Sequence, residues 1–454
     1  MKFLFILFVT NTFAFTDPNF YSSTIIDLEE IFEDDTSDKI YKSRKHILTE
    51  NALAALEDKN KVIDENFEVP NYFKSNVYFW FSIYTQYSSK QVLIHDKSNL
   101  DLIYRVLDFS EIHESDLNIF TKFKIQNQLT KESVKKLKQD LKNLSIGKQN
   151  ESNEYVITIL NEHGVAIPKS PIKAKTFYLN LATNLRTQTG QKNMIYKGVI
   201  NSEIYLEYLQ RIMGHFKIPT ELIGIAFLES SFNYKAMSRV GASGIWQFMP
   251  YIANLFMPKI TNHVDYRSNP VISSISAFHL LRQNYKILKR WDLAVPAYNS
   301  GTKHLIKAKR KFKNVKNVDL AYILENYNHP HLGFASQNFY SEFLALVHAL
   351  KYKNTFFNVD GSLISKKVDN SKVEVYVSRC KFRTPKLAKR FGANIIDLNP
   401  QFDSKSVIYP QRSLIVSDKA LPNAYFYKLP IKTIEGKFPK HWHQGVTIKS
   451  CNFI

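Results

Sequence analysis

The sequence predicts a mainly α-helical protein that ends in a small α/β module. Two patterns indicate this fold class. Between residues 185 and 350, apolar residues recur three and four positions apart in successive segments, which is typical of amphipathic helices. After residue 370, short stretches alternate apolar and polar residues, which is typical of strands. A hydrophobic content of 44% and only 14 glycines exclude a disordered or a collagen-like chain.

The N-terminus has the pattern of a secretory signal peptide. Lys2 is followed by an uncharged and mostly apolar run, and Thr12 and Ala14 provide small residues before a cleavage point, so we expect residues 1–16 to be removed on export. The run is shorter than the roughly 20 residues that span a bilayer. With no cysteine near the cleavage point, the sequence predicts a periplasmic or secreted protein that is not a lipoprotein and is peripheral to a membrane at most.

The net charge is strongly positive. The chain holds 61 Lys and Arg residues against 41 Asp and Glu residues, which gives a formal charge of +20. Such an excess attracts a polyanion, which could be nucleic acid, an anionic membrane or an acidic cell-wall polymer. Because the chain is expected to be exported, we do not expect nucleic acid as its partner.

Cysteines are few. Cys380 and Cys451 could form one disulfide in an oxidising compartment, which would contribute about 4 kcal/mol in the chain-entropy model, or they could remain two thiols. Two cysteines cannot build a Cys-rich metal site. We expect no metal, no organic cofactor and a monomeric protein.

The segment before the helical region carries no functional signal. Residues 17–184 read as a largely helical extension, in which Lys131 to Leu144 form a charged amphipathic helix. Residues 76–105 mix aromatic and β-branched residues and fit either a helix or a strand.

The region 185–355 reads as one helical domain. Its predicted helices are Ser202 to Phe216, Thr220 to Ser231, Val271 to Leu288, one near Leu293 to Tyr298, and one near Ser336 to Lys351. A loop-rich stretch, Asn233 to Pro250, separates the second helix from the third.

One glutamate lies on an apolar stripe. Leu222, Ile225, Ala226 and Glu229 occupy one face of the second helix, so the carboxyl stands where leucine is expected. Burial should raise its pKa and keep its proton near neutral pH, which is what a general acid needs. The alternative is a glutamate at the rim of the stripe that reaches solvent.

Three motifs follow in order: Glu229-Ser230, then Gly241 to Pro250, then Ala297 to Gly301. This set resembles the lytic transglycosylases of peptidoglycan, and most closely the membrane-bound lytic murein transglycosylase D type. The resemblance covers about 185–350 and implies a lysozyme-like helical domain that acts on peptidoglycan glycan strands.

The resemblance implies a role for each motif residue. Glu229 would be the catalytic acid and then the base, with Tyr298 holding its orientation. The residues expected to shape the site or bind glycan are Ser230, Gln247, Met249, Asn299 and Tyr340.

The chain departs from the family in three places. Pro296 stands where a small residue is usual, and Trp246 and Phe248 are larger than in many members. The final helix, at 337–340, lacks a family-typical acidic residue, although Tyr340 keeps the aromatic place.

Only two other acids lie between Glu229 and Gly301. We expect Asp265 to be a cap or an ion partner and Asp292 to start a helix. A single carboxyl fits an intramolecular reaction, because no positioned water is required. The resemblance implies that this reaction cleaves the bond between N-acetylmuramic acid and N-acetylglucosamine and yields a 1,6-anhydromuramyl end. The rivals are a hydrolase like the goose-type lysozymes, which uses water, and a non-catalytic wall-binding protein.

The C-terminal module, residues 370–420, has a predicted strand–helix–helix–strand order and is followed by a tail at 421–454. It resembles a divergent LysM unit, with Cys380 in place of the usual turn, and could bind glycan or act as a structural cap. The basic run from Lys303 to Lys316 could hold anionic peptide stems, or it could be a solvated face.

Overall fold

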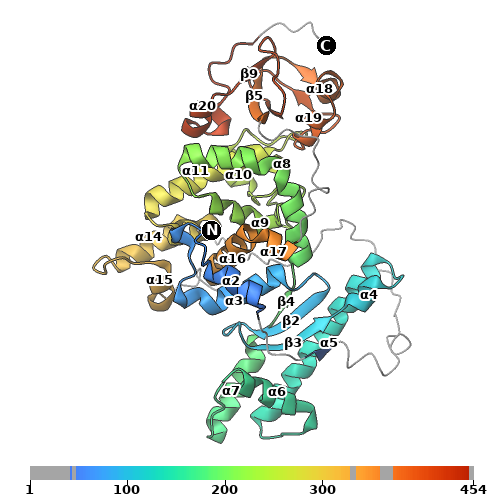
Figure 1. Ribbon diagram of the computed structural model, residues 1–454, viewed down its shortest axis with the longest axis vertical. Helices are drawn as coiled ribbons and strands as arrows, with labels where there is room; N and C mark the ends of the chain where they lie inside the picture. Colours follow the sequence, from blue (N-terminus) through green and yellow to red (C-terminus); the bar gives the residue numbers. More distant parts are fainter. Residues whose placement is uncertain (1–40, 43–47, 328–333, 358–371, 449–454) are drawn as a thin grey trace.

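A computed structural model describes residues 41–42, 48–327, 334–357 and 372–448 of the 454. The predicted signal peptide lies outside these residues. The chain is mainly helical, as predicted, and the model has three parts along its long axis (Figure 1). A helical body lies in the middle, a helical arm extends from one side, and the C-terminal module lies at the opposite end.

The predicted helices of the body are present. After the first long helix, α8 (Lys192–Phe216), the chain forms η4 (Thr220–Ile223), α9 (Gly224–Ser230), α10 (Pro250–Phe256), η5 (Tyr266–Ser268), α11 (Pro270–Leu288), α12 (Trp291–Ala294), α13 (Pro296–Ser300), α14 (Thr302–Lys311), α15 (Leu320–Asn326), α16 (Phe334–Lys351) and α17 (Lys353–Phe357). Helix α11 is buried along most of its length. It begins at Pro270, and the Asn269 side chain accepts hydrogen bonds from the Val271 and Ile272 amides, which caps the helix.

Part of the N-terminal extension belongs to the body. Its elements are α2 (Glu50–Glu57), η2 (Glu65–Phe67), η3 (Asn71–Phe73) and α3 (Lys74–Thr85). Helix α3 packs against α16, where the Trp80 Nε1 atom donates to the Asn338 Oδ1 atom over 3.1 Å. These residues therefore share the core that supports the body helices.

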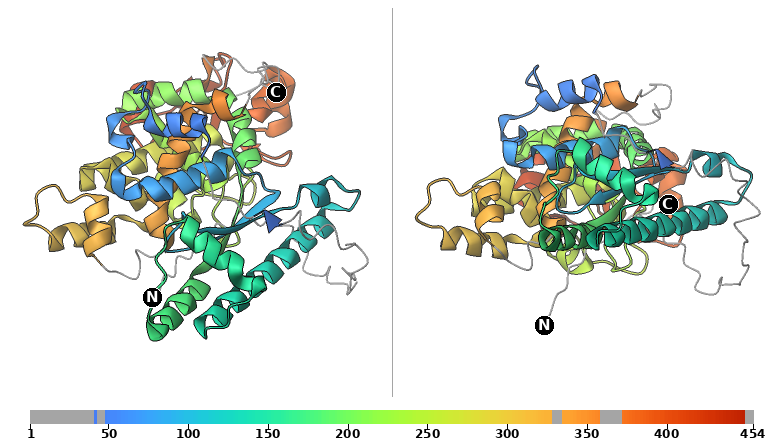
Figure 2. Two further views of the ribbon diagram at one scale, coloured as in Figure 1. Left: turned by 60° about the horizontal axis from the view of Figure 1, so that its bottom comes forward. Right: turned by 90° about the horizontal axis from the view of Figure 1, so that it is seen from below.

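The arm has a core of its own. An antiparallel sheet in the order β1 (Tyr41–Lys42), β3 (Ile103–Asp108), β2 (Gln91–Asp96), β4 (Leu185–Thr189) separates it from the body. Leu93 of β2 joins the body core, while its neighbours Val92 and Ile94 join the arm core, as the two faces of a strand require. The arm helices are α4 (Ser110–Glu114), α5 (Ile119–Ser145), α6 (Glu151–Glu162) and α7 (Pro171–Asn184). Figure 2 shows α5 and α7 side by side, projecting from the body.

The C-terminal module has the predicted strand–helix–helix–strand order with additional strands. Its elements are β5 (Glu374–Ser378), β6 (Phe382–Arg383), α18 (Thr384–Phe391), α19 (Asn394–Asp397), β7 (Val407–Ile408) and β8 (Leu414–Ser417). The predicted tail adds β9 (Phe426–Lys428), which pairs with β5, then α20 (Ile431–Gly436) and η9 (Pro439–His441). Cys380 is buried and disulfide-bonded, and Cys451 lies outside the described residues.

Candidate active site

Glu229 lies at the C-terminal end of α9 and is partly exposed. Ile225 and Ala226, on the preceding turn, are buried. Burial raises the pKa of Glu229 from an ordinary 4.5 to about 8, and the charge of Glu342 adds to this shift. A carboxyl with such a pKa keeps its proton at neutral pH.

Glu342, on α16, is a second carboxyl at this site that the sequence analysis missed. Burial raises its own pKa to about 8. We described the stretch 337–340 as lacking an acidic residue, but Asn338 and Glu342 are four positions apart and so share one face of α16. That face also meets α3. There the Asn338 Oδ1 atom accepts a hydrogen bond from the Trp80 indole, and the charge of Glu342 adds to the burial that raises the pKa of Tyr84. Helical spacing from Asn338 places Glu342 on that face, but only the packing of α16 on α9 brings it to Glu229.

Asp265 and Asp292 are engaged in the ways expected of them. Asp265 pairs with Arg267 and accepts its backbone amide, which caps η5. Asp292 lies in the first turn of α12, pairs with Arg290 and accepts the Leu320 amide.

Tyr298, on α13, is a neighbour of Glu229. Burial raises the Tyr298 pKa well above its usual range, and the charge of Glu229 adds to the shift. The Tyr298 hydroxyl donates to the Trp246 carbonyl oxygen over 2.8 Å, which fixes the ring. Asn299 follows on the same helix and is partly exposed.

Residues 231–249, which we call the site loop, bond to Ser230 and Tyr298, two neighbours of Glu229. The Ser230 hydroxyl lies 3.1 Å from the Ile245 carbonyl oxygen, one residue before the carbonyl that accepts from Tyr298. The indole of Trp246 is fully buried and donates to the Ser274 hydroxyl over 2.8 Å. Trp246 is therefore a core residue, and its backbone is what reaches the site.

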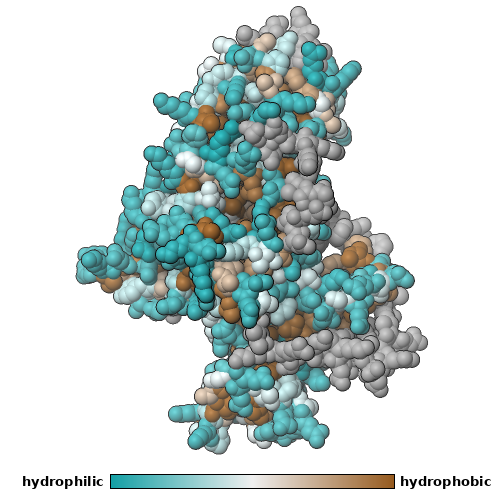
Figure 3. All heavy atoms as spheres, viewed as in Figure 1, coloured by the Kyte–Doolittle hydropathy of each residue, from teal (hydrophilic) through white to brown (hydrophobic). Residues whose placement is uncertain are grey.

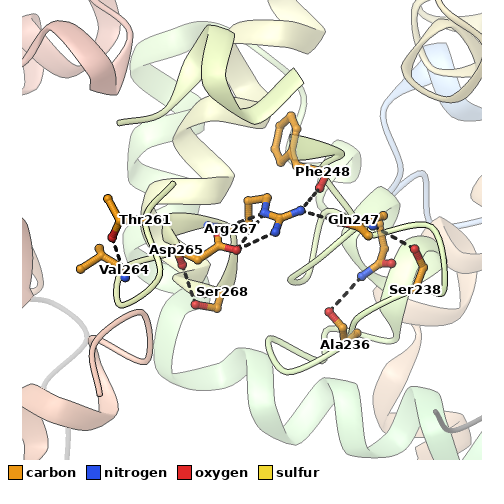
Figure 4. Close-up of polar contacts among 11 residues, drawn as sticks. Ala236, Ser238, Gln247, Phe248, Thr261, Val264, Asp265, Arg267 and Ser268 are labelled. Carbon is orange, nitrogen blue, oxygen red and sulfur yellow. Dashed lines mark hydrogen bonds and ion pairs between the residues drawn. The ribbon is translucent and has the colours of Figure 1, made fainter. Parts of the chain in front are cut away.

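Gln247 helps to hold the site loop together. Its backbone is left-handed, with φ of 45°. Its side-chain Nε2 atom donates to the Gly244 carbonyl over 2.9 Å and contacts the Ala236 carbonyl at 3.3 Å (Figure 4). Met249, at the end of the loop, is partly exposed and precedes α10.

Arg267 clamps the site loop from the other side, as Figure 4 shows. Its buried guanidinium pairs with both oxygens of Asp265, and its Nη1 atom donates to the Gly241 carbonyl over 2.5 Å and the Phe248 carbonyl over 3.0 Å. Gly244, with φ of 78°, lies against the Arg267 backbone so closely that an added Cβ would stand 1.7 Å from its oxygen. The two ends of the Gly241–Phe248 turn are therefore tied to one side chain.

Tyr340 takes a core position. It is 1% exposed, its ring contacts Phe73 and Phe343, and its hydroxyl is 3.5 Å from the Asn66 carbonyl. Residues two apart in a helix point in nearly opposite directions, so Tyr340 and Glu342 cannot face the same side. The structure thus brings Ser230, Tyr298 and Glu342 around Glu229, and it places Tyr340 in the core.

Neither a metal cluster nor a membrane-crossing helix is found in the part of the chain that the structure describes. Within those residues, His, Cys, Asp and Glu side chains form no group of three or more that could hold a metal ion. Among the same residues, no helix combines the length and apolar character needed to cross a membrane.

Comparison with known proteins identifies the central segment. Residues 207–320 match the family described as "Transglycosylase SLT domain". The membrane-bound lytic murein transglycosylase D of Escherichia coli (strain K12) is 30% identical over 118 residues, which is 26% of either chain. A relative named for tributyltin chloride resistance, from Alteromonas sp. (strain M-1), is 32% identical over 117 residues, 26% of this chain and 56% of its own.

These matches confirm the resemblance that the motifs predicted and also mark its extent. The chain spans about a quarter of the length of the murein transglycosylase that it matches. Glu229, Gln247, Tyr298 and Asn299 lie inside the matched family segment, whereas Tyr340 and Glu342 lie beyond its end.

Proposed function

We propose that this chain, which carries a transglycosylase SLT domain at residues 207–320, is a lytic transglycosylase that cleaves peptidoglycan between N-acetylmuramic acid and N-acetylglucosamine. The observation that carries the proposal is the placement of Glu229 within that segment: a half-buried carboxyl whose pKa is raised to about 8. Such a group is a general acid at neutral pH.

The reaction needs only one proton carrier. Protonated Glu229 gives its proton to the glycosidic oxygen while the bond from that oxygen to C1 of the muramyl residue breaks. The resulting carboxylate takes the proton of the muramyl C6 hydroxyl, whose oxygen bonds to C1 and closes the 1,6-anhydro ring. No water is consumed, and Glu229 ends as it began. The attacking hydroxyl is tethered to the reacting sugar, which supplies the high effective concentration of an intramolecular reaction.

Neighbouring residues would hold the acid and the glycan. Tyr298 and Ser230, whose hydroxyls bond to carbonyls of the site loop, are proposed to keep the Glu229 carboxyl in place. Asn299 and the amide oxygen of Gln247 are proposed to bind glycan amides or hydroxyls, since the Gln247 nitrogen is occupied within the loop. Met249 would pack at the wall of the cleft, and Tyr340 would support α16 from the core.

Hydrolysis by water is the second candidate, and Glu342 is the observation that favours it. Glycosidases that use water employ two carboxyls. Glu342 supplies a second one, close enough that its charge adds to the raised pKa of Glu229. Its raised pKa argues against this role, because a base that activates water must be ionised at the working pH.

Digestion of purified peptidoglycan sacculi separates the candidates. The expected fragments end in 1,6-anhydromuramic acid and contain no oxygen from the solvent when the reaction runs in ¹⁸O-labelled water. Reducing ends that carry ¹⁸O would instead establish the hydrolase. Glu229→Gln should bind sacculi and release nothing, and a wild-type protein that binds without releasing fragments would identify a non-catalytic wall-binding protein. Sacculi with acetylated and with deacetylated glycan should be compared, since binding of glycan amides by Asn299 and Gln247 is part of the proposal.

A further inference from the structure

The segment from Thr261 to Asn269, which we call the strap, lies between the site loop and the C-terminal module. On one side, Arg267 of the strap holds both ends of the Gly241–Phe248 turn, and Gly244 packs on its backbone. On the other side, the strap meets residues of the module. It is therefore in contact with both parts.

The contact with the module is a buried network of amide side chains. The Nδ2 atom of Asn269 donates to the Gln401 Oε1 atom over 2.7 Å and to the Leu398 carbonyl over 3.1 Å. Gln401 in turn donates to the Asn399 Oδ1 atom over 3.0 Å. Asn269 and Asn399 are fully buried and Gln401 is 4% exposed, so a lost bond could not be replaced by bulk water.

Tyr266 adds a second buried link. Its hydroxyl accepts the Leu414 amide of β8 over 2.8 Å, and its ring packs edge-on against Phe402. Strap residue Val264 also forms an isolated antiparallel bridge with Phe402. Because these bonds are buried and directional, the module is fixed to the strap rather than joined to it by chain alone.

We propose that the C-terminal module is a positioning element of the active site and acts through the strap. Gln401 and Leu414 hold Asn269 and Tyr266, which fixes Arg267 between them. Arg267 then fixes the site loop, whose Ile245 and Trp246 carbonyls hold Ser230 and Tyr298 beside Glu229.

The site loop needs such support from outside. Gly244 and Gln247 both have positive φ, and a non-glycine residue such as Gln247 keeps this backbone only where its surroundings impose it. Two sets of bonds support this backbone: the Gln247 side chain holds the Gly244 and Ala236 carbonyls, and Arg267 holds the Phe248 carbonyl next to Gln247. The second set is only as rigid as the strap that carries Arg267. The catalytic part of this inference rests on the proposed function, whereas the mechanical coupling does not.

The test compares two variants that loosen the strap with one matched control. Gln401→Leu removes the bonds of Gln401 to Asn269 and Asn399 at nearly constant volume, and Tyr266→Phe removes only the hydroxyl that accepts the Leu414 amide. Ser378→Ala is the control: Ser378 is fully buried in the same module, but its hydroxyl bonds to Cys380 and does not touch the strap. Should Gln401→Leu fail to fold, Tyr266→Phe decides the question.

Amide hydrogen exchange measures the coupling without any assay of activity. We expect exchange at the Gly244 and Gln247 amides to accelerate about tenfold in Gln401→Leu, less in Tyr266→Phe, and not in Ser378→Ala, because only the first two release the clamp. Unchanged protection of these amides in the folded strap variants would overturn the proposal. So would acceleration that is equal in the site loop and in the arm helices α5 and α7, since that reports general destabilisation.

Kinetics on a soluble glycan then test the consequence for the reaction. The strap variants should lower kcat about tenfold while KM stays the same, as expected when an acid is mispositioned but the glycan still binds. The alkaline decline of their rate should also move to lower pH, because a loosened loop admits water to Glu229 and so lowers its pKa.

Normal kcat and an unchanged alkaline decline, despite faster exchange in the site loop, would overturn the catalytic role of the module. A wild-type chain that releases no fragments would contradict the proposed function alone, and hydrogen exchange would still decide the coupling.

Discussion

Glu229, on α9, and Glu342, on α16, lie close enough that the charge of Glu342 adds to the burial that raises the pKa of Glu229. The two helices are far apart in the sequence and pack directly against each other in the body. Both carboxyls have a pKa of about 8, so at neutral pH the pair holds its protons and the first to be lost makes the second harder to remove.

The rate of fragment release should therefore fall on the alkaline side. In the proposed reaction Glu229 must be protonated to act, so kcat/KM should be level below a pH of about 8 and decline above it. Measuring kcat/KM on a soluble glycan across pH locates this alkaline decline, the alkaline limb of the profile. A decline that begins near pH 5 would mean that the Glu229 carboxyl is solvated like an ordinary one.

The same shifts predict how stability depends on pH. Both carboxyls have a folded pKa near 8 against an ordinary 4.5, so between these values the folded chain binds more protons than the unfolded one. The free energy of unfolding should then decrease as pH rises through this window. Replacing both residues by glutamine should flatten the dependence, as measured by urea unfolding. A difference between wild type and double variant that does not change with pH would contradict the shifts.

Replacing Glu342 with glutamine should separate its electrostatic effect from catalysis. Glu342→Gln removes the negative charge that Glu342 acquires when it loses its proton, so the pKa of Glu229 should decrease and the alkaline decline in rate should move to lower pH. At a pH well below the limb, the rate should stay within about threefold of wild type, because Glu229 alone moves the proton. Loss of activity at every pH, in a folded protein, would instead make Glu342 a catalytic base and favour the hydrolase.

Local patterns of the sequence were sufficient for the helices and made Glu229 a candidate, which the ordered motifs and the family resemblance then favoured. The body helices follow from apolar spacing, which depends on neighbours within a few positions, and Glu229 stood out because it interrupts such a stripe. The role of Asp265 as a cap and ion partner and the place of Asp292 at a helix start were also predictable, whereas the ion pair of Asp292 with Arg290 was not predicted.

Contacts between distant segments were not predictable. Glu342 was missed because only the packing of α16 on α9 brings it to Glu229. Residues 76–105 were ambiguous because α3 is buried on most sides and shows little amphipathic pattern. The hydrogen bond from Trp80 of α3 to Asn338 of α16 joins residues that lie far apart in the sequence. The strap was not expected either, because single amides such as Asn269 and Gln401 have no sequence signature before their partners are known.

The basic helix α14 begins directly after the α13 helix that carries Asn299, and its exposed cations should bind anionic wall components. Lys303, Lys307 and Arg310 lie on its outer face and have no ion-pair partner among the described residues. Figure 3 shows the projecting end formed by α14 and α15 covered by hydrophilic side chains. Lys307→Glu combined with Arg310→Glu should weaken sacculus binding several-fold, more at low than at high salt, because surface charges are screened by salt. Equal charge reversal at Lys135 and Lys138 of the arm is the control, and equal weakening by both pairs would show a general charge effect.

Two glycines of the site loop offer a matched test of how tightly the loop is packed. Gly241 and Gly244 both have positive φ, 87° and 78°, so alanine is strained at either position. They differ in the room available for a side chain: an added Cβ meets nothing within 4 Å at Gly241 but stands 1.7 Å from the Arg267 backbone oxygen at Gly244.

Gly241→Ala should therefore cost about 1 kcal/mol of stability and leave most activity. Gly244→Ala must push the loop away from Arg267 and so displace the carbonyls that hold Ser230 and Tyr298. Its kcat should decrease at least about a hundredfold, since small displacements of a catalytic group cost that much. Urea unfolding and kcat, measured on both variants, test this difference. Equal effects at the two positions would mean that the packing of the site loop on Arg267 does not determine the position of the Glu229 carboxyl.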